Sequence, residues 1–377
     1  MIALPQKLPR WLAPALFVAA LGAALWRAPN PAAPAFVPPP AATASTLPAL
    51  FTAQMLPQAA ESAHAATLVQ LADGRLAAAW FAGSREGAAD VAIWFSTQGR
   101  DGWSKPQPIA NRESTAGGVF AHVRKVGNPV LHVEGSWLHL WYVSVGIGGW
   151  AGSSINHSVS TDGGQSWTKP TKLQTSPFAN ISTLVRTPPV ALADGEIGLP
   201  VYHEFIAKHG EWLRLSPTGQ ILDKTRMAHP VSTLQPAVVA LDAQRALALL
   251  RDAGPGPGRV QVATTANGGQ RWTAGEALPI PNPNSSVALL RLKSGRLLLA
   301  GNPPDGREAL LLWISADEGE TWQASRSIEA TADGGAEFSY PALLLGRDGR
   351  IHVAYTWRRQ GIKVASFSEA WLDGGQP

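Results

Sequence analysis

The sequence predicts an all-β protein folded as a six-bladed β-propeller. One observation is a turn motif, S-x-D-x-G-x-[ST]-W, which occurs intact at residues 160–167 and again at residues 315–322. Weaker copies lie at residues 265–272 and 96–103. The second observation is a series of six hairpin turns spaced by roughly 50–60 residues, within reach of the period of four-stranded propeller blades. Another repetitive all-β sandwich or a solenoid is the alternative.

Each position of the turn motif has a mechanical role. The Ser160 and Asp162 side chains can hydrogen-bond backbone groups of a tight turn. The glycine can adopt positive φ at little steric cost. The ring of Trp167 can pack beneath the turn. We therefore expect each copy of the motif to fasten a hairpin.

The six hairpin turns share a short polar stretch between two apolar runs. Flanking segments such as residues 131–133 and 139–143 have the apolar, β-branched and aromatic content of strands. The turns lie at residues 73–76, 134–138, 194–197, 242–247, 294–297 and 348–351. We expect one blade per turn. The last blade is expected to close with its own C-terminal strands or with residues near Phe51.

Residues 1–27 predict a signal peptide or a membrane anchor. Lys7 and Arg10 precede an apolar run over residues 11–26, which is the charge pattern of an export signal. The run is shorter than the ~20 residues that a membrane-spanning helix needs. Both alternatives predict export, with the propeller secreted, in the periplasm, or anchored to the inner membrane and facing the periplasm.

Residues 28–50 predict a linker, because they are mostly proline and alanine and carry no periodic apolar pattern. The propeller is therefore expected to span residues 51–377. The chain contains no cysteine, which excludes disulfides, thiolate metal sites and cysteine nucleophiles. The net charge of +4 is compatible with an anionic substrate.

Known cofactor and nucleic-acid motifs are absent from the sequence. It has no glycine-rich phosphate loop, no His-x-x-x-His pair with a glutamate and no basic stripe interleaved with aromatics. We therefore expect no cofactor, no metal and no nucleic-acid partner. A monomer is expected.

Polar and aromatic residues recur at the hairpin ends that lie opposite the turns. The strand leading into each turn is preceded by His64, Asn128, Arg186, Gln235, Asn284 and Tyr340. The partner strand is followed by Arg85 and Glu86, Tyr202 to Glu204, Arg251, Asn302, and Trp357 to Arg359. Because the two ends of a hairpin lie side by side, both sets should gather around the propeller axis and form a concave polar site.

With these motifs the chain resembles the sialidase superfamily, whose six-bladed propellers carry repeated Asp boxes. The resemblance covers residues 62–359. It is strongest to a bacterial and plant sialidase-like branch that shares the phrases Ser-His-Ala-Ala-Thr, Arg-Glu-Gly, Asn-Pro-Asn-Ser and Phe-Ser-Tyr-Pro. In this superfamily three arginines hold the sialic acid carboxylate, a tyrosine paired with a glutamate is the nucleophile, and an aspartate in a first-blade loop is the acid/base.

The resemblance implies roles for five residues of this chain. Arg251 and Arg307 stand where the second and third carboxylate-binding arginines are expected. Tyr340 stands in the place of the nucleophile. Arg85 and Asp90 fit the arginine and the acid/base aspartate of the first-blade loop.

Two positions depart from the family pattern. His64 replaces the first arginine, which removes one guanidinium from the carboxylate clamp. Gln235 replaces the glutamate, and a neutral amide cannot take a proton from Tyr340. A neutral histidine can act as a base or a donor near pH 7, so His64 is a further catalytic candidate. Glu86 is a rival to Asp90 as the acid.

The other site candidates are predicted to bind substrate: Asn128, Gln235, Asn284, and the rim residues Trp357 and Arg358. Structural alternatives remain open, since Asp90 could start a strand and Tyr340 could be a core aromatic. The expected function is an exo-glycosidase that hydrolyses a terminal acidic sugar, sialic acid or a uronate, from a glycan. The alternative is a catalytically inactive glycan-binding propeller of the cell envelope, which His64 and Gln235 favour.

Overall fold

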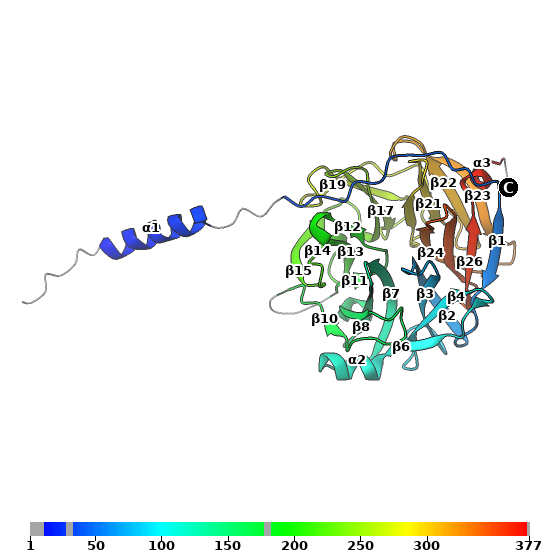
Figure 1. Ribbon diagram of the computed structural model, residues 1–377, viewed down its shortest axis with the longest axis horizontal. Coiled ribbons are helices and arrows are strands. Elements are labelled where there is room, and N and C mark those ends of the chain that lie inside the picture. The colour runs from blue at the N-terminus through cyan, green and yellow to red at the C-terminus, as the bar shows by residue number, and fades with distance from the viewer. Residues whose placement is uncertain (1–10, 28–32, 177–181, 375–377) are drawn as a thin grey trace, which may run out of the picture. The chain divides into compact units, whose positions relative to one another are not determined.

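The computed structural model describes residues 11–27, 33–176 and 182–374. The chain divides into two units, Met1–Ala33 and Pro34–Pro377. The second unit consists of six antiparallel sheets arranged around a common axis (Figure 1). The prediction of an all-β, six-bladed propeller is confirmed.

The first three blades follow the chain. Blade one contains β2 (Ser62–Gln70), β3 (Leu76–Gly83), β4 (Ala92–Gly99), β5 (Gly102–Trp103) and β6 (Gln107–Asn111). Blade two contains β7 (Lys125–Glu134), β8 (Trp137–Val145), β9 (Ser153–Ser160) and β10 (Thr171–Lys172). Blade three contains β11 (Leu184–Val185), β12 (Val190–Ala191), β13 (Ile197–Glu204), β14 (Lys208–Leu215) and β15 (Ile221–Met227).

The other three blades complete the ring. Blade four contains β16 (Thr233–Ala240), β17 (Ala246–Asp252), β18 (Gln261–Thr265) and β19 (Thr273–Ala274). Blade five contains β20 (Ala288–Arg291), β21 (Leu297–Gly301), β22 (Ala309–Ser315) and β23 (Gln323–Ala330). Blade six contains β24 (Phe338–Leu345), β25 (Ile351–Trp357), β26 (Gly361–Phe367) and β1 (Phe51–Met55).

Helices are few in the described residues. They are α1 (Leu12–Arg27), α2 (Arg112–Val119), α3 (Glu369–Asp373), and the 3₁₀ turns η1 (Trp150–Gly152) and η2 (Ala193–Gly195). None of the helices within the described ranges has the length and apolar character needed to cross a membrane. Lys7 and Arg10 of the predicted export signal lie outside the described residues.

The two kinds of predicted turn occupy different places in the blades. Each of the six recurring turns connects the first strand of a blade to the long strand that follows it. The turn at Gly74, for example, connects β2 to β3. The S-x-D-x-G-x-[ST]-W motifs connect the third strand of a blade to the fourth. The hairpin ends opposite the recurring turns therefore lie at one face of the propeller, which we call the axial face.

The intact turn motif is fastened by its own side chains. Ser160 Oγ donates to Asp162 Oδ1 at 2.7 Å and accepts from the backbone N–H of Gly164 at 2.8 Å. Asp162 Oδ1 also accepts from the backbone N–H of Ser166 at 2.9 Å. Gly164 has φ of 93°, and a Cβ there would lie 2.3 Å from the Phe95 ring. Glycine is thus required by both conformation and packing.

The strength of each motif copy follows its sequence. In the copies at residues 160–167 and 315–322, the indole N–H of Trp167 and Trp322 donates to a glycine carbonyl at 3.2 and 2.9 Å. In the weaker copies, the indole nitrogens of Trp272 and Trp103 are buried without a hydrogen-bond partner. The weaker copies therefore lack the hydrogen bond from the indole to a glycine carbonyl that closes the intact turns.

The hydrophobic core lies between neighbouring sheets. Phe81 and Ile93 of blade one pack in the same buried cluster as Leu131 and Leu140 of blade two. Similar clusters occupy the other interfaces between blades. Burial of each such side chain stabilises the fold by ~1.5–3 kcal/mol. The blades are therefore held together by apolar packing, while hydrogen bonds act within each sheet.

Blade six is closed by the strand that precedes blade one. β1 pairs antiparallel with β26, with Phe51 opposite Phe367 and Met55 opposite Lys363. The ring of Phe51 stacks on Trp371 with 4.7 Å between centroids. Of the two closures expected from the sequence, the one that uses residues near Phe51 is the one observed.

Part of the predicted linker packs on the propeller. Phe36 is 1% exposed and its ring lies edge-on to Trp212, with centroids 5.9 Å apart. Its backbone N–H donates to the carbonyl of Ala243 at 2.9 Å. Farther along, the hydroxyl of Ser368 donates to the carbonyl of Pro48 at 2.8 Å. Within the linker expected over residues 28–50, the residues from Pro34 onward thus belong to the same compact unit as the propeller.

These contacts predict which N-terminal residues the fold needs. A variant that starts at Pro34 should melt within about 2 °C of the full chain, since it keeps Phe36 and β1. A variant that starts at Gln58 should melt far lower, because it exposes the edge of β26 and opens the ring. Differential scanning calorimetry of both variants measures the difference. Equal melting temperatures would show that β1 does not close the propeller.

Candidate functional site

Left-handed residues lie in, or shortly before, the first strand of several blades at the axial face. Ala65, Asn128, Gln235, Asn284 and Tyr340 have φ between 46° and 55°. Pairing with the second strand shifts register at four of these positions, in blades one, two, four and six. Such bulges re-aim side chains, and each left-handed residue costs on the order of 1–3 kcal/mol. Repetition of the same strained feature around the axis indicates a functional site.

Tyr340 lies at the centre of this site. Its hydroxyl accepts a hydrogen bond from Arg251 Nη1 at 2.9 Å. The same Nη1 lies 3.2 Å from Gln235 Oε1, and Arg251 Nε donates to Asn284 Oδ1 at 2.7 Å. The structure thus brings together four of the predicted residues. Gln235 accepts from a guanidinium here.

Two further arginines flank the Tyr340 ring. The guanidinium carbon of Arg307 lies 5.6 Å from the ring centre and that of Arg186 lies 5.3 Å away. Arg307 is partly exposed, and its Nη2 donates to the carbonyl of Asn284 at 3.1 Å. Arg186 is 2% exposed and donates to the carbonyls of Tyr340 and Ala66 at 2.6 and 3.2 Å. Arg186 therefore braces the bulges, while Arg307 remains within reach of a ligand.

His64 stands one residue before the left-handed Ala65, so its register differs from that of Asn128 or Tyr340. Its side chain is buried, and Nδ1 is 2.8 Å from Thr356 Oγ1. The imidazole ring lies 4.2 Å from the Tyr340 ring, centre to centre. Burial, and then the charge of Arg359, holds the pKa of His64 well below its usual value. His64 is thus a neutral support for Tyr340 in this geometry.

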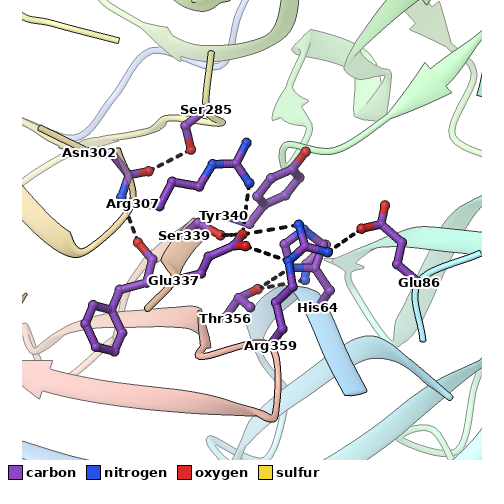
Figure 2. Close-up of polar contacts among 12 residues, drawn as sticks. His64, Glu86, Ser285, Asn302, Arg307, Glu337, Ser339, Tyr340, Thr356 and Arg359 are labelled. Atoms are coloured by element: carbon purple, nitrogen blue, oxygen red, sulfur yellow. Dashed lines mark hydrogen bonds and ion pairs between the residues drawn. The ribbon is translucent and has the colours of Figure 1, made fainter. Parts of the chain in front are cut away.

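Arg359 supplies a fourth guanidinium, close to His64, the residue that stands in place of the first arginine of the family pattern. Figure 2 shows it between two carboxylates. Its Nε donates to Glu337 Oε2 at 2.5 Å, and its Nη1 is ion-paired with Glu86. Glu86, a predicted acid, is therefore engaged in a salt bridge. The signal for Arg359 in the sequence was its position after the last long strand, next to Arg358.

Glu337 joins two of these arginines. Arg307 Nη1 donates to Glu337 Oε1 at 2.9 Å, and the hydroxyl of Ser339 donates to the same oxygen (Figure 2). Burial raises the pKa of Glu337, but the hydrogen bonds from Arg359 and Ser339 and the charge of Arg307 lower it to about 2. A carboxylate held in this way fixes the arginines and is unsuited to proton transfer near neutral pH.

Asn128 reaches the site through a buried tyrosine. Asn128 Nδ2 and Gln235 Nε2 each donate to the hydroxyl of Tyr202 at 3.3 Å. Burial raises the pKa of Tyr202 far above its ordinary value. Asn128 is only 6% exposed. Its predicted role in binding substrate therefore remains a prediction, whereas its contact with Tyr202 is structural.

The first-blade loop holds its aspartate at the surface. Asp90 accepts from the backbone N–H and the hydroxyl of Ser84, at 2.9 and 3.0 Å. These hydrogen bonds lower the pKa of Asp90. Arg85 is exposed in the same loop. Within the described residues, no hydrogen bond or ion pair joins Arg85 or Asp90 to the residues around Tyr340. Their predicted roles remain predictions.

Glu204 is a carboxyl group of the axial face whose pKa is raised, unlike that of Asp90. It ends β13 and is partly buried, and burial raises its pKa while the charges of Arg251, Lys208 and Lys125 oppose the rise. Lys125 lies 4.0 Å over the Trp150 ring. Glu204 is thus the group in this region best suited to carry a proton. No motif marks it, and only its position at a hairpin end could have identified it.

Trp357 and Arg358 lie at the edge of the site. The guanidinium carbon of Arg358 is 5.4 Å from the centre of the Trp357 ring, and Nη2 is 3.0 Å from Asp333 Oδ2. Both residues are partly exposed. This arrangement of a cation over an indole is compatible with the predicted rim.

The ion pairs of Glu337 predict a pH-dependent contribution to stability. Its pKa of about 2 in the folded protein is below its ordinary value of 4.5, so the stabilisation is complete above pH 4.5 and is lost as the pH falls toward 2. After allowance for solvent screening, we expect Glu337→Gln to lower the free energy of unfolding by about 2 kcal/mol at pH 7. Urea denaturation should show a gap less than half as large at pH 3. A gap that stays constant from pH 7 to pH 3 would contradict this assignment.

Comparison with known proteins agrees with the fold. The family model described as "BNR repeat-like domain" matches residues 74–353. A search of curated proteins found no match. The solved structure of the Hadza microbial sialidase Hz136 is 16% identical with a TM-score of 0.67, and the match covers 82% of this chain. This chain spans 66% of the length of that sialidase.

Two other solved structures are similar over nearly their whole length. A protein of unknown function from Dyadobacter fermentans is 16% identical, with a TM-score of 0.67 and coverage of 84% of this chain and 97% of the other. The intramolecular trans-sialidase from Ruminococcus gnavus is 14% identical, with a TM-score of 0.64 and coverage of 86% and 98%. At these identities the likeness concerns the fold. Since the family model spans well over half of the sequence, the chain belongs to the BNR repeat-like domain family.

Proposed function

We propose that this propeller is a sialidase-like exo-glycosidase that hydrolyses a terminal acidic sugar, sialic acid or a uronate, from a glycan. The observation that carries the proposal is the pair of partly exposed guanidinium groups, Arg251 and Arg307, against Tyr340. Planar guanidinium groups bind carboxylates with paired, charge-assisted hydrogen bonds. A sugar carboxylate held there would lie close to the Tyr340 hydroxyl.

Arg251 is the better anion ligand of the two. Its hydrogen-bond partners Gln235, Asn284 and Tyr340 are all neutral. Arg307, by contrast, shares its charge with Glu337. Among the described residues no ion pair involves Arg251. Its positive charge is therefore available to a ligand.

In the proposed reaction the Tyr340 oxygen attacks the anomeric carbon and releases its proton to solvent, while the glycosidic bond breaks and an acid protonates the departing oxygen. Water then cleaves the bond between the sugar and Tyr340 and returns a proton to the tyrosine oxygen. The resemblance assigns the acid to Asp90. Glu204 is a second candidate, because burial raises its pKa, and a carboxyl group with a raised pKa is better suited to act as a general acid.

A binding module without catalysis is the second candidate function. Gln235 favours it, because its amide accepts a hydrogen bond from Arg251 and cannot take the proton of Tyr340. The same arginines would then hold the acidic sugar of a glycan without cleaving it. The two functions share the anion site and differ in turnover.

Tyr340→Phe separates the two functions. The phenylalanine ring keeps its place between Arg186 and Arg307, so affinity for an acidic sugar should change little. Turnover of aryl sialosides or aryl uronides should be lost if the hydroxyl is the nucleophile. Full activity in this variant would exclude Tyr340 as the nucleophile. Binding without turnover by the unaltered protein would favour the binding module.

Replacing Arg251 with alanine tests the anion site. The loss of charge-assisted hydrogen bonds of ~1.5–3 kcal/mol should weaken binding of the acidic sugar about 10- to 150-fold, measured by titration calorimetry. Arg100→Ala is the matched control, because it removes the same charge from an exposed turn at the opposite face. Melting temperatures should change little in both variants. A binding loss that follows the unfolded fraction would mean that Arg251 only braces the blades.

A further inference from the structure

Two histidines and a glutamate meet at the axial end of the β13–β14 hairpin in blade three. His203 pairs with His209 across the two strands, and Glu211 follows two residues later in β14. Residues at i and i+2 of a strand share a face, so the three side chains lie together. Their candidate ligand atoms are all within 4.8 Å of one another. The two imidazole rings stack with centroids 4.9 Å apart.

Two polar atoms of this cluster are buried without partners. The side chain of Glu211 is 6% exposed, and its Oε2 forms no hydrogen bond. The side chain of His209 is 11% exposed, and its Nδ1 is likewise unpartnered. Only Glu211 Oε1 is used, by Lys224 Nζ at 2.9 Å and His209 Nε2 at 3.3 Å. A buried carboxylate oxygen and a buried ring nitrogen without partners require an explanation, because such atoms are nearly always satisfied.

We propose that His203, His209 and Glu211 bind a divalent transition metal, with Zn²⁺ as the best fit. Two imidazoles and a carboxylate are a donor set that Zn²⁺ accepts, with water as the fourth ligand. Mg²⁺ and Ca²⁺ fit poorly because they prefer oxygen ligands.

Metal binding requires a small rearrangement of these side chains. Zinc bonds of ~2.0–2.1 Å place tetrahedral ligand atoms about 3.4 Å apart, closer than the 4.8 Å limit of the cluster. The stacked rings must turn toward Glu211. The ammonium group of Lys224, whose side chain is 31% exposed, must leave for solvent because the metal replaces its charge.

The location gives the metal a role at the axial face. His203 immediately precedes Glu204, and the loop that follows exposes Phe205 and Ile206 by 55% and 88%. A metal that joins His203 to His209 would tie the two strands at the base of this loop and so fix the backbone that carries Glu204. The sequence predicted no metal, because the His-x₅-His-x-Glu spacing acquires meaning only when a hairpin brings its ends together.

Zinc chloride is the probe for this site. The full chain, without a histidine tag and freed of metals with EDTA, should retain one zinc per chain in equilibrium dialysis followed by elemental analysis. His203→Ala should weaken zinc binding about 100-fold or more, because it removes a direct ligand. His122→Ala, which removes an exposed histidine outside the cluster, should bind zinc as the unaltered chain does.

Lys224→Met distinguishes a metal site from a simple ion pair. If zinc and the ammonium compete for Glu211, removing the ammonium should tighten zinc binding. Thermal melting should then rise by several degrees on zinc addition. The proposal fails if the unaltered chain retains no stoichiometric zinc, or if His203→Ala binds as much as the unaltered chain. Because zinc is measured without any glycan, the result is independent of the proposed function.

Discussion

The left-handed bulges of the first strands are the constraint on which the axial site depends. A regular strand would alternate its side chains between the two neighbouring blades, and none would point along the axis. The bulges at Gln235 and Tyr340, together with the left-handed Asn284 ahead of β20, break that alternation and bring three blades to one guanidinium, that of Arg251. The buried Arg186 makes the strain tolerable, because it satisfies the carbonyls that the bulges at Ala65 and Tyr340 leave unpaired.

Much of the fold was predictable because it depends on interactions between residues that are close together in the sequence. A turn such as residues 160–167 needs its own serine, aspartate, glycine and tryptophan, and these hydrogen bonds involve no distant residue. The packing of Phe36 against Trp212 was not predictable, since a proline- and alanine-rich segment carries no periodic pattern to mark one buried ring. The closure by β1 could be expected only as one of two alternatives, because its partner β26 lies at the other end of the chain.

Site residues were predictable where they recur at the same position in successive blades. They were less predictable where their role depends on contact with a residue that is distant in the sequence. Gln235, Asn284 and Tyr340 stand in, or shortly before, the first strand of their blades, and overlaying the blades reveals them. His64 was misplaced by one residue in that overlay, because Ala65 takes the left-handed position. Arg359 could not be paired with Glu337 from sequence, since their contact depends on the bend after β25. Electrostatic roles such as that of Glu204 depend on burial, which no spacing encodes.

Gln235 stands where the family pattern has a glutamate. This difference affects both the expected transfer of a proton from Tyr340 and the net charge around Arg251. A glutamate at this position would pair with Arg251 and neutralise it, as Glu337 does for Arg307. The amide accepts the same hydrogen bond and leaves the positive charge of Arg251 uncompensated. An arginine whose hydrogen-bond partners are all neutral binds an incoming carboxylate more strongly, because no ion-paired carboxylate has to be displaced. The loss of a base for Tyr340 and the gain of an open cationic site are therefore consequences of one substitution. Under the proposed function, affinity for the acidic sugar and the rate of its cleavage would then be separable properties.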